Sequence, residues 1–86
     1  METVRVALLQ LVPAGDLAGN LAKGIDACRQ AKAMGAVIAL FPEMWHNGYR
    51  VAADPDVLRR DAIAPDDPFI LAFRDLAREL DMAIGI

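Results

Sequence analysis

Two short apolar segments on either side of one amphipathic stretch constrain the fold of this chain more than any other feature. Residues 4–12 and 36–41 are rich in aliphatic side chains with little alternation, which is typical of strands buried on both faces. Between them, apolar residues recur at steps of three and four, which predicts a helix with one apolar face: Leu17, Leu21, Ile25, Cys28 and Ala31. A strand, a helix and a strand in this order indicate a βαβ unit with parallel strands and a right-handed crossover.

The residues around these segments provide the signals that begin and end helices. Asp16 is placed to cap the first helix, and Gly35 occupies the position where a glycine turns the chain out of it. An irregular stretch follows from about residue 43 to residue 67, with a short helical turn expected at 56–61. Asp67 and Pro68 then form a cap and a first helical position.

The second helix has its own apolar stripe, and a third apolar segment follows it. The stripe consists of Ile70, Phe73, Ala77 and Leu80, and residues 82–86 begin a third buried strand, inside which the sequence stops. We therefore expect an α/β fold, β-α-β-α-β in order, with three adjacent parallel strands and both helices on the same side. The 56% hydrophobic content is high for so short a chain, so we expect the open sheet face and last strand to expose Val, Ile and Leu.

Composition excludes several classes of function. The net charge of −3, without a cluster of Lys and Arg, argues against nucleic-acid binding. Cys28 is the single cysteine, so no internal disulfide forms, and a reducing compartment is favoured. The N-terminus does not resemble a signal peptide, and the longest apolar run, residues 33–42, is too short to span a bilayer. We expect a cytoplasmic protein without a membrane partner.

Glu43 is the strongest candidate for a catalytic side chain. It follows Pro42 just beyond the second expected strand, and sites in open α/β sheets form beyond the carboxyl ends of the strands. Its neighbours Phe41, Met44 and Trp45 would partly desolvate the carboxylate and make it a better proton acceptor. From position alone, Glu43 is either a general base or a carboxylate that hydrogen-bonds the amides of its loop.

The residues around Glu43 resemble the first signature of the nitrilase superfamily of carbon–nitrogen hydrolases. In that family a buried strand ends in Pro-Glu, and a Gly-Tyr pair follows a few residues later. The features that carry the resemblance run in order along nearly the whole chain: Gln10 in the opening strand, Asp16 and Asn20 at the first helix, residues 35–43, the pair Gly48-Tyr49, and residues 73–86 ending in Ala-Ile-Gly-Ile.

The resemblance implies a Glu-Lys-Cys triad on an αββα sandwich. The cysteine would attack a nitrile, amide or N-carbamoyl carbon, Glu43 would act as general base, and the lysine would stabilise the oxyanion. The lysine and cysteine of the family lie beyond residue 86, so we expect residues 1–86 to be an N-terminal fragment of the hydrolase domain, inactive alone. We expect a small-molecule substrate, neither a cofactor nor a metal, and a homo-oligomeric full-length protein.

Other polar and aromatic residues are weaker candidates. Cys28 lies on the apolar stripe of the first helix and is interpreted as a small buried hydrophobe rather than a nucleophile. Lys23 and Lys32 belong to the solvated face of that helix and are not promoted to the catalytic lysine. Three loop residues could line a substrate pocket: Trp45, His46 and Tyr49. Trp45 and Tyr49 could equally pack over the sheet, and His46 could be an ordinary surface residue.

Competing motifs are missing from the sequence, and one other class of function remains open. The glycines after the first strand do not form G-x-G-x-x-G, no G-K-[ST] occurs, and a chain without serine has no G-x-S-x-G elbow. The alternative to a hydrolase is a non-catalytic, flavodoxin-like α/β module that binds a ligand or partner with the same strand end. A later lysine and cysteine, each at a strand end, would distinguish the hydrolase from the binding module.

Overall fold

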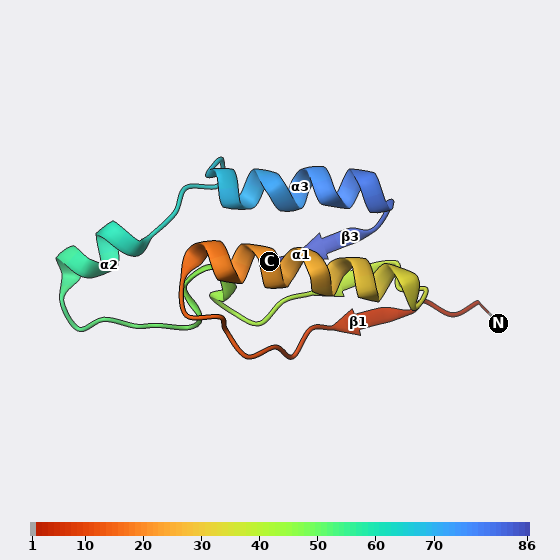
Figure 1. Ribbon diagram of the computed structural model, residues 1–86, viewed down its shortest axis with the longest axis horizontal. Coiled ribbons are helices and arrows are strands. Elements are labelled where there is room, and N and C mark those ends of the chain that lie inside the picture. The colour runs from red at the N-terminus through yellow and green to blue at the C-terminus, as the bar shows by residue number, and fades with distance from the viewer. Residues whose placement is uncertain (1) are drawn as a thin grey trace.

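The fold is an open three-stranded sheet with helices, seen in a computed structural model that describes residues 2–86. Its elements follow one another as drawn in Figure 1: β1 (Val6–Leu8), α1 (Leu17–Ala33), β2 (Ile38–Leu40), the 3₁₀ turn η1 (Trp45–Asn47), α2 (Pro55–Asp61), α3 (Pro68–Leu80) and β3 (Ala83–Gly85). The two long helices and the three strands form the body of the molecule.

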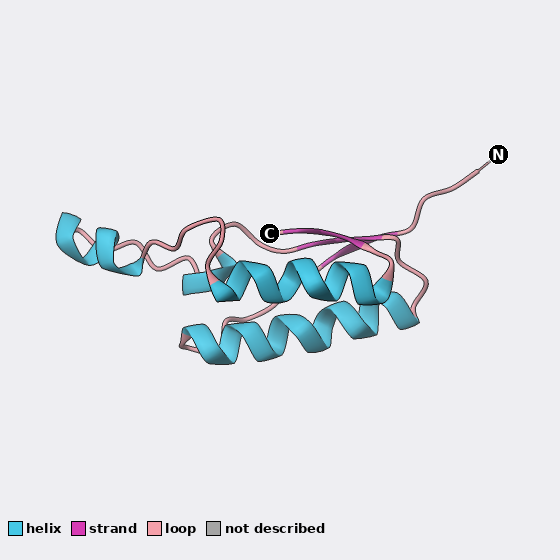
Figure 2. Cartoon of the chain, turned by 90° about the horizontal axis from the view of Figure 1, so that it is seen from above, coloured by secondary structure: helices cyan, strands magenta, loops and turns pink. Residues whose placement is uncertain are grey.

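The sheet has the predicted topology. Its strand order is β1-β2-β3 and both pairs are parallel, with Val6 opposite Ile38 and Ile38 opposite Ala83. Figure 2 shows α1 and α3 side by side on one side of the strands, and the two helices contact each other. The expectation of three adjacent parallel strands with both helices on the same side is therefore confirmed.

The strands are shorter than the apolar segments that predicted them. Each strand has three residues, whereas the apolar segments span residues 4–12, 36–41 and 82–86. Single hydrogen bonds extend the pairing by one step, from Val37 N to Arg5 O at 2.9 Å and from Leu9 N to Leu40 O at 2.8 Å. Beyond Leu8 the chain turns, because Gln10 N donates to the Leu8 carbonyl at 3.0 Å. The apolar segments indicate where each strand lies, but the hydrogen bonds between neighbouring backbones determine where each strand ends.

One face of the sheet carries apolar side chains that no described residue covers. Neighbours across parallel strands point to the same face, so Ala7 and Ala39 face the helices while Leu8 and Leu40 face away from them. Leu8 is 66% exposed and Leu40 is 43% exposed, and Ile86 at the end of the third strand segment is also exposed. Val6, two residues before Leu8 on the same face, is 42% exposed. The predicted exposure of Val, Ile and Leu on the open face and the last strand is therefore confirmed.

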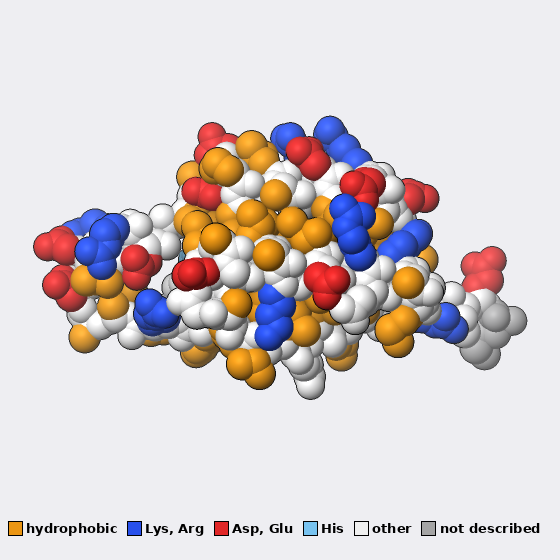
Figure 3. Space-filling view, in the orientation of Figure 1, with side chains coloured by type: hydrophobic (Ala, Val, Ile, Leu, Met, Phe, Trp, Pro, Cys, Tyr) orange, Lys and Arg blue, Asp and Glu red, His pale blue; other side chains and the backbone are white. Residues whose placement is uncertain are grey.

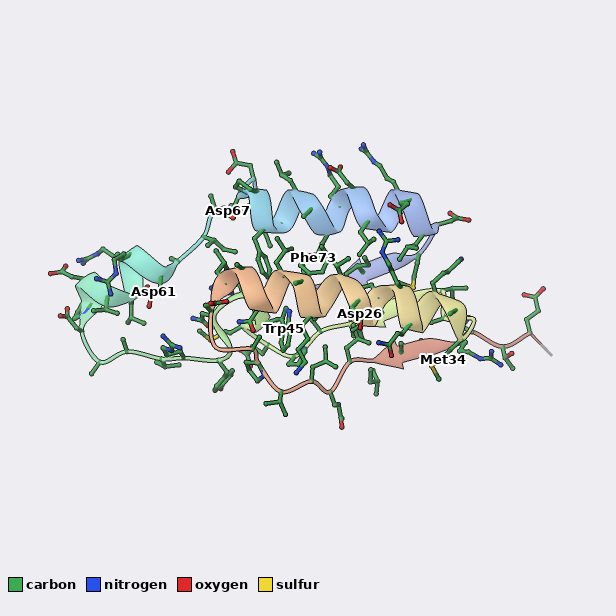
Figure 4. The ribbon with its side chains drawn as sticks, in the orientation of Figure 1. Asp26, Met34, Trp45, Asp61, Asp67 and Phe73 are labelled. Atoms are coloured by element: carbon green, nitrogen blue, oxygen red, sulfur yellow. The ribbon has the colours of Figure 1, made fainter. Side chains whose placement is uncertain are left out.

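An aromatic cluster fills the space between the helices and the sheet. Phe73 of α3 lies at its centre, with ring centroids 5.1 Å from Phe41 and 5.2 Å from Phe69, and Phe41 is 5.6 Å from Trp45. Figure 4 shows Phe73 pointing from α3 towards α1, and Figure 3 shows apolar side chains gathered along the seam between the two helices. The rings hold both helices and the loop after β2 in one core.

The buried face of α1 includes Cys28 and Ala31 of the stripe expected from the sequence, but in the first half of the helix it is rotated away from that stripe. Leu17 is exposed, and Leu21 and Ile25 are only half-buried, whereas Asn20 and Gly24 are buried. The reason is close packing against the aromatic cluster. A Cβ atom built on Gly24 would lie 2.8 Å from Phe73 Cζ and 3.0 Å from Trp45 Nε1.

The segment between the two long helices extends from the body. The turn expected at residues 56–61 forms as α2, capped by the Asp54 side chain, and no residue of α2 is buried. Figure 1 shows α2 set apart from the sheet and the long helices. No helix within residues 2–86 is long and apolar enough to cross a membrane.

Candidate functional site

Glu43 lines a small open cavity at the carboxyl ends of β1 and β2. The cavity has a volume of about 310 Å³ and is bordered by Leu11, Pro13, Pro42, Glu43, Trp45, Gly48 and Tyr49. Its walls are two loops. We call residues 9–15, which follow β1, the first loop, and residues 41–50, which follow β2, the second loop. Ligand sites of open parallel sheets lie at this edge, so the structure places Glu43 where such a site is expected.

The second loop adopts an unusual backbone conformation on both sides of η1. Met44 and Tyr49 have φ angles of 55° and 62°, which place two non-glycine residues in the left-handed region. Two backbone hydrogen bonds close the turn, from Tyr49 N to Met44 O at 3.1 Å and from Gly48 N to Trp45 O at 3.2 Å. Strained backbone of this kind persists only where surrounding contacts hold it, and it is frequent at functional sites.

Gly48 is required by both conformation and space. Its φ of 69° favours glycine, and a Cβ atom at this position would lie 2.9 Å from Cβ of Pro13 in the first loop. The Gly-Tyr pair of the motif therefore has a physical role. Gly48 lets the two loops touch, and the chain then turns at Tyr49 beside Glu43.

The side chain of Asn20, in the first turn of α1, is hydrogen-bonded to both loops. It is 1% exposed, and within residues 2–86 it is the one buried polar residue. Its side-chain oxygen accepts a hydrogen bond from Ala14 N at 2.7 Å, and its Nδ2 donates to the His46 carbonyl at 3.2 Å. In the sequence, Asn20 stands out only as one of the features of the family resemblance at the start of the first helix. The sequence signal for a buried Asn20 is its helical register with Gly24, Ala27 and Ala31, which are buried on the same face of α1.

The structure brings three of the four predicted site residues to one cavity. Glu43, Trp45 and Tyr49 border the same space, whereas His46 lies in the walls of neighbouring hollows that do not include Glu43. Trp45 is 2% exposed and its Nε1 donates to the Asn20 carbonyl at 3.0 Å, so most of its ring belongs to the core. Tyr49 is 61% exposed and forms the open side of the cavity.

The expected desolvation of Glu43 by its neighbours is wrong for the described residues. Glu43 is exposed, because Trp45 turns into the core instead of covering the carboxylate. The side-chain hydrogen bonds of the second loop are made by Asn20, Trp45, Asn47 and Arg50. None of these bonds involves the Glu43 carboxylate. The loop therefore keeps its conformation without using this carboxylate as a hydrogen-bond acceptor.

The cysteine and the lysines of α1 do not border the cavity. Cys28 is 0% exposed and packs in the core, and burial raises the pKa of its thiol to about 11. Lys23 donates to the Val12 carbonyl at 2.5 Å, and Lys32 donates to the Asp81 carbonyl at 3.4 Å. Residues 2–86 therefore present no thiol or ammonium group in the wall of the Glu43 cavity.

Cys28 is expected to resist alkylation in the native protein. The thiolate is the reactive form, and a pKa of about 11 instead of 9.0 lowers its fraction at pH 8 by roughly a hundredfold. Iodoacetamide labelling followed by peptide mass spectrometry measures the rate at this position, with the urea-unfolded protein as the control. Labelling of the native and unfolded protein at equal rates would contradict the buried position of Cys28.

Comparison with known proteins connects this site to one family. The carbon–nitrogen hydrolase family profile matches residues 5–86. The chain is also 33% identical over 85 residues to the glutamine-dependent NAD(+) synthetase of Thermotoga maritima, and this covers 98% of the chain but 14% of that protein. No significant match was found among the solved structures. The family match includes both loops and Glu43, and it confirms the resemblance to the nitrilase superfamily: this chain belongs to the carbon–nitrogen hydrolase family.

Proposed function

We propose that this chain forms the N-terminal part of an enzyme that hydrolyses a non-peptide carbon–nitrogen bond, with Glu43 as general base. The observation that carries the proposal is the position of Glu43. It lies in the wall of a cavity at the strand ends, on a strained loop that begins with Pro42-Glu43 and ends with Gly48-Tyr49. A carboxylate held in this way, and not used to fix its own loop, is available to exchange protons with a ligand.

The proposed chemistry follows the Glu-Lys-Cys mechanism. Glu43 accepts the proton of a cysteine thiol as the sulfur attacks the substrate carbon, and it passes this proton to the nitrogen, which leaves as ammonia or an amine and gives a thioester. Glu43, ionised again, then takes a proton from water as the water attacks the thioester, and it returns this proton to the departing sulfur to restore the thiol. A lysine stabilises the oxyanion in both steps. The lysine and the cysteine would both come from sequence outside residues 1–86.

The exposed apolar face of the sheet supports the proposed αββα sandwich. Val6, Leu8 and Leu40 lie on the face away from α1 and α3, and all three are at least 42% exposed. Contiguous apolar surface of this kind marks a place where another part of the protein packs. A second sheet packed here would also bring further side chains to the strand ends and desolvate Glu43 more fully than residues 2–86 do.

A carboxamide is the proposed substrate class. The synthetase of Thermotoga maritima to which the chain is similar is named for its dependence on glutamine, and the side chain of glutamine is a carboxamide. Hydrolysis of an amide at the Glu43 cavity would release ammonia or an amine and leave a carboxylate. Nitriles and N-carbamoyl compounds are the other substrates on which the same triad chemistry could act, so they are the comparison set.

Ammonia release by the protein from the complete gene tests the proposal. We expect turnover of glutamine or another carboxamide above that of nitriles and N-carbamoyl compounds, and no turnover by the isolated 86-residue chain. If turnover by this chain disappeared in Cys28→Ala, Cys28 would be the nucleophile after all. Ligand binding without turnover of any substrate by the complete protein would instead support a non-catalytic module.

A further inference from the structure

We propose that Asn20 is a positioning residue for the general base, holding together the two loops that form the Glu43 cavity. The inference rests on the proposed function, since it assigns a role in the same reaction. Asn20 does not border the cavity itself. It lies beneath it, in the first turns of α1, with its side chain 1% exposed.

The two side-chain hydrogen bonds of Asn20 reach opposite walls of the cavity. Ala14, which donates to Oδ1 at 2.7 Å, follows Pro13 in the first loop. His46, whose carbonyl accepts from Nδ2 at 3.2 Å, lies in η1 between Glu43 and Gly48 in the second loop. One planar amide therefore fixes the distance between the loop that carries Glu43 and the loop that faces it.

Other contacts between the loops differ from this amide in place or in kind. Arg50 Nη2 donates to the Gly15 carbonyl at 3.3 Å, but this bond is exposed and joins the last residues of the two loops. Gly48 lies so near Pro13 that a Cβ atom on it would be 2.9 Å from Pro13 Cβ, and packing of this kind carries no preferred direction. Trp45 donates to the backbone carbonyl of Asn20, so this bond remains when the side chain is changed. A substitution at position 20 thus keeps the Trp45 anchor in the core and the exposed Arg50–Gly15 bond, and removes the link that the buried Asn20 amide makes between the loops.

The loss of this link should appear in the rate of reaction. A misplacement of about 1 Å can lower a rate by roughly a hundredfold, because general-base catalysis depends on the position of the carboxylate. We expect Asn20→Ala to lower kcat of the complete enzyme at least tenfold, at temperatures where the variant is folded. Asn20→Asp leaves no cavity and can still accept from Ala14 N, but its carboxylate cannot donate to the His46 carbonyl. We expect a loss of similar size from Asn20→Asp.

A matched variant separates positioning from simple destabilisation. Leu76 of α3 is 5% exposed and packs in the core away from the cavity. Leu76→Ala should lower the melting temperature as Asn20→Ala does, yet leave kcat of the folded enzyme within about twofold of the parent. Equal kcat losses in the Leu76 and Asn20 variants, or no loss in either Asn20 variant, would overturn the positioning role.

A double-variant cycle tests whether Asn20 acts through Glu43. If it does, adding Asn20→Ala to Glu43→Gln should reduce kcat by less than about twofold further, because the base to be positioned is already gone. A full additional tenfold loss would overturn the inference. Glu43→Gln alone decides the proposed function. If it abolishes turnover while the Asn20 variants retain it, only the role of Asn20 fails, and if it retains turnover, both proposals fail.

Discussion

Replacing Phe73 by alanine is expected to lower the free energy of unfolding by about 3–5 kcal/mol. Phe73 is 2% exposed and its ring packs against Phe41 and Phe69. It also lies against Gly24, where α1 passes too close for any side chain. Tight packing on several sides prevents the core from collapsing into the space that the ring leaves, so the loss of the ring is not offset by repacking.

The measurement is thermal or denaturant unfolding of the complete protein, with Arg74→Ala as the control. Arg74 is the next residue of α3, is exposed, and bonds only to its neighbour Asp75 at 3.2–3.3 Å. Its replacement should change the free energy of unfolding by less than about 0.5 kcal/mol. A Phe73→Ala loss no larger than that of Arg74→Ala would show that the aromatic cluster is not packed as described.

The order and type of the main elements could be predicted because several local signals agreed. Asp16 and Asp67 cap the two long helices with the expected side-chain hydrogen bonds, to Gly19 N at 2.6 Å and to Phe69 N at 2.8 Å. Gly35 leaves α1 with a φ of 87°, as a glycine at that position does. The parallel sheet then followed from chain connectivity alone, since each helix has to return the chain to the same end of the sheet.

The lengths of the strands and the buried face of α1 could not be predicted, because both depend on tertiary contacts. Apolar residues continue past Leu8, but no neighbouring strand pairs with them beyond Leu9. On α1, a period of three to four residues fits more than one stripe. The stripe that is buried in the structure includes Asn20 and Gly24, and their small or polar side chains give no hydrophobic signal in the sequence.

In the site, too, some features could be predicted from the local sequence and others depend on tertiary contacts. Local sequence points to Glu43, since Pro42, Gly48 and Tyr49 mark the motif, and Glu43 borders the same cavity as Tyr49. The exposure of Glu43 does not follow from its neighbours in the sequence, because Trp45 turns inwards and donates to the Asn20 carbonyl instead of covering the carboxylate. The link made by Asn20 could not be seen from the sequence, because it joins residues 14 and 46.

Glu43→Gln is expected to lower kcat of the complete enzyme by at least about a hundredfold while the protein stays folded. Positioned proton transfer contributes about 10²- to 10⁴-fold, and glutamine can neither take the thiol proton nor activate water. The change is nearly isosteric, and Glu43 is exposed and makes none of the loop's hydrogen bonds, so little stability should be lost. His46→Ala is the control in the same loop. His46 does not border the Glu43 cavity, and its replacement should cost far less.

The most direct test of the general-base role is kcat of Glu43→Gln, measured together with its melting temperature on the best carboxamide substrate. We predict a melting temperature close to that of the parent and a kcat lowered by two or more orders of magnitude. A folded variant that retains more than about a tenth of the parent kcat would contradict the role, because one decade is only about 1.4 kcal/mol of barrier. A lowered melting temperature with near-normal kcat would identify Glu43 as a structural residue instead.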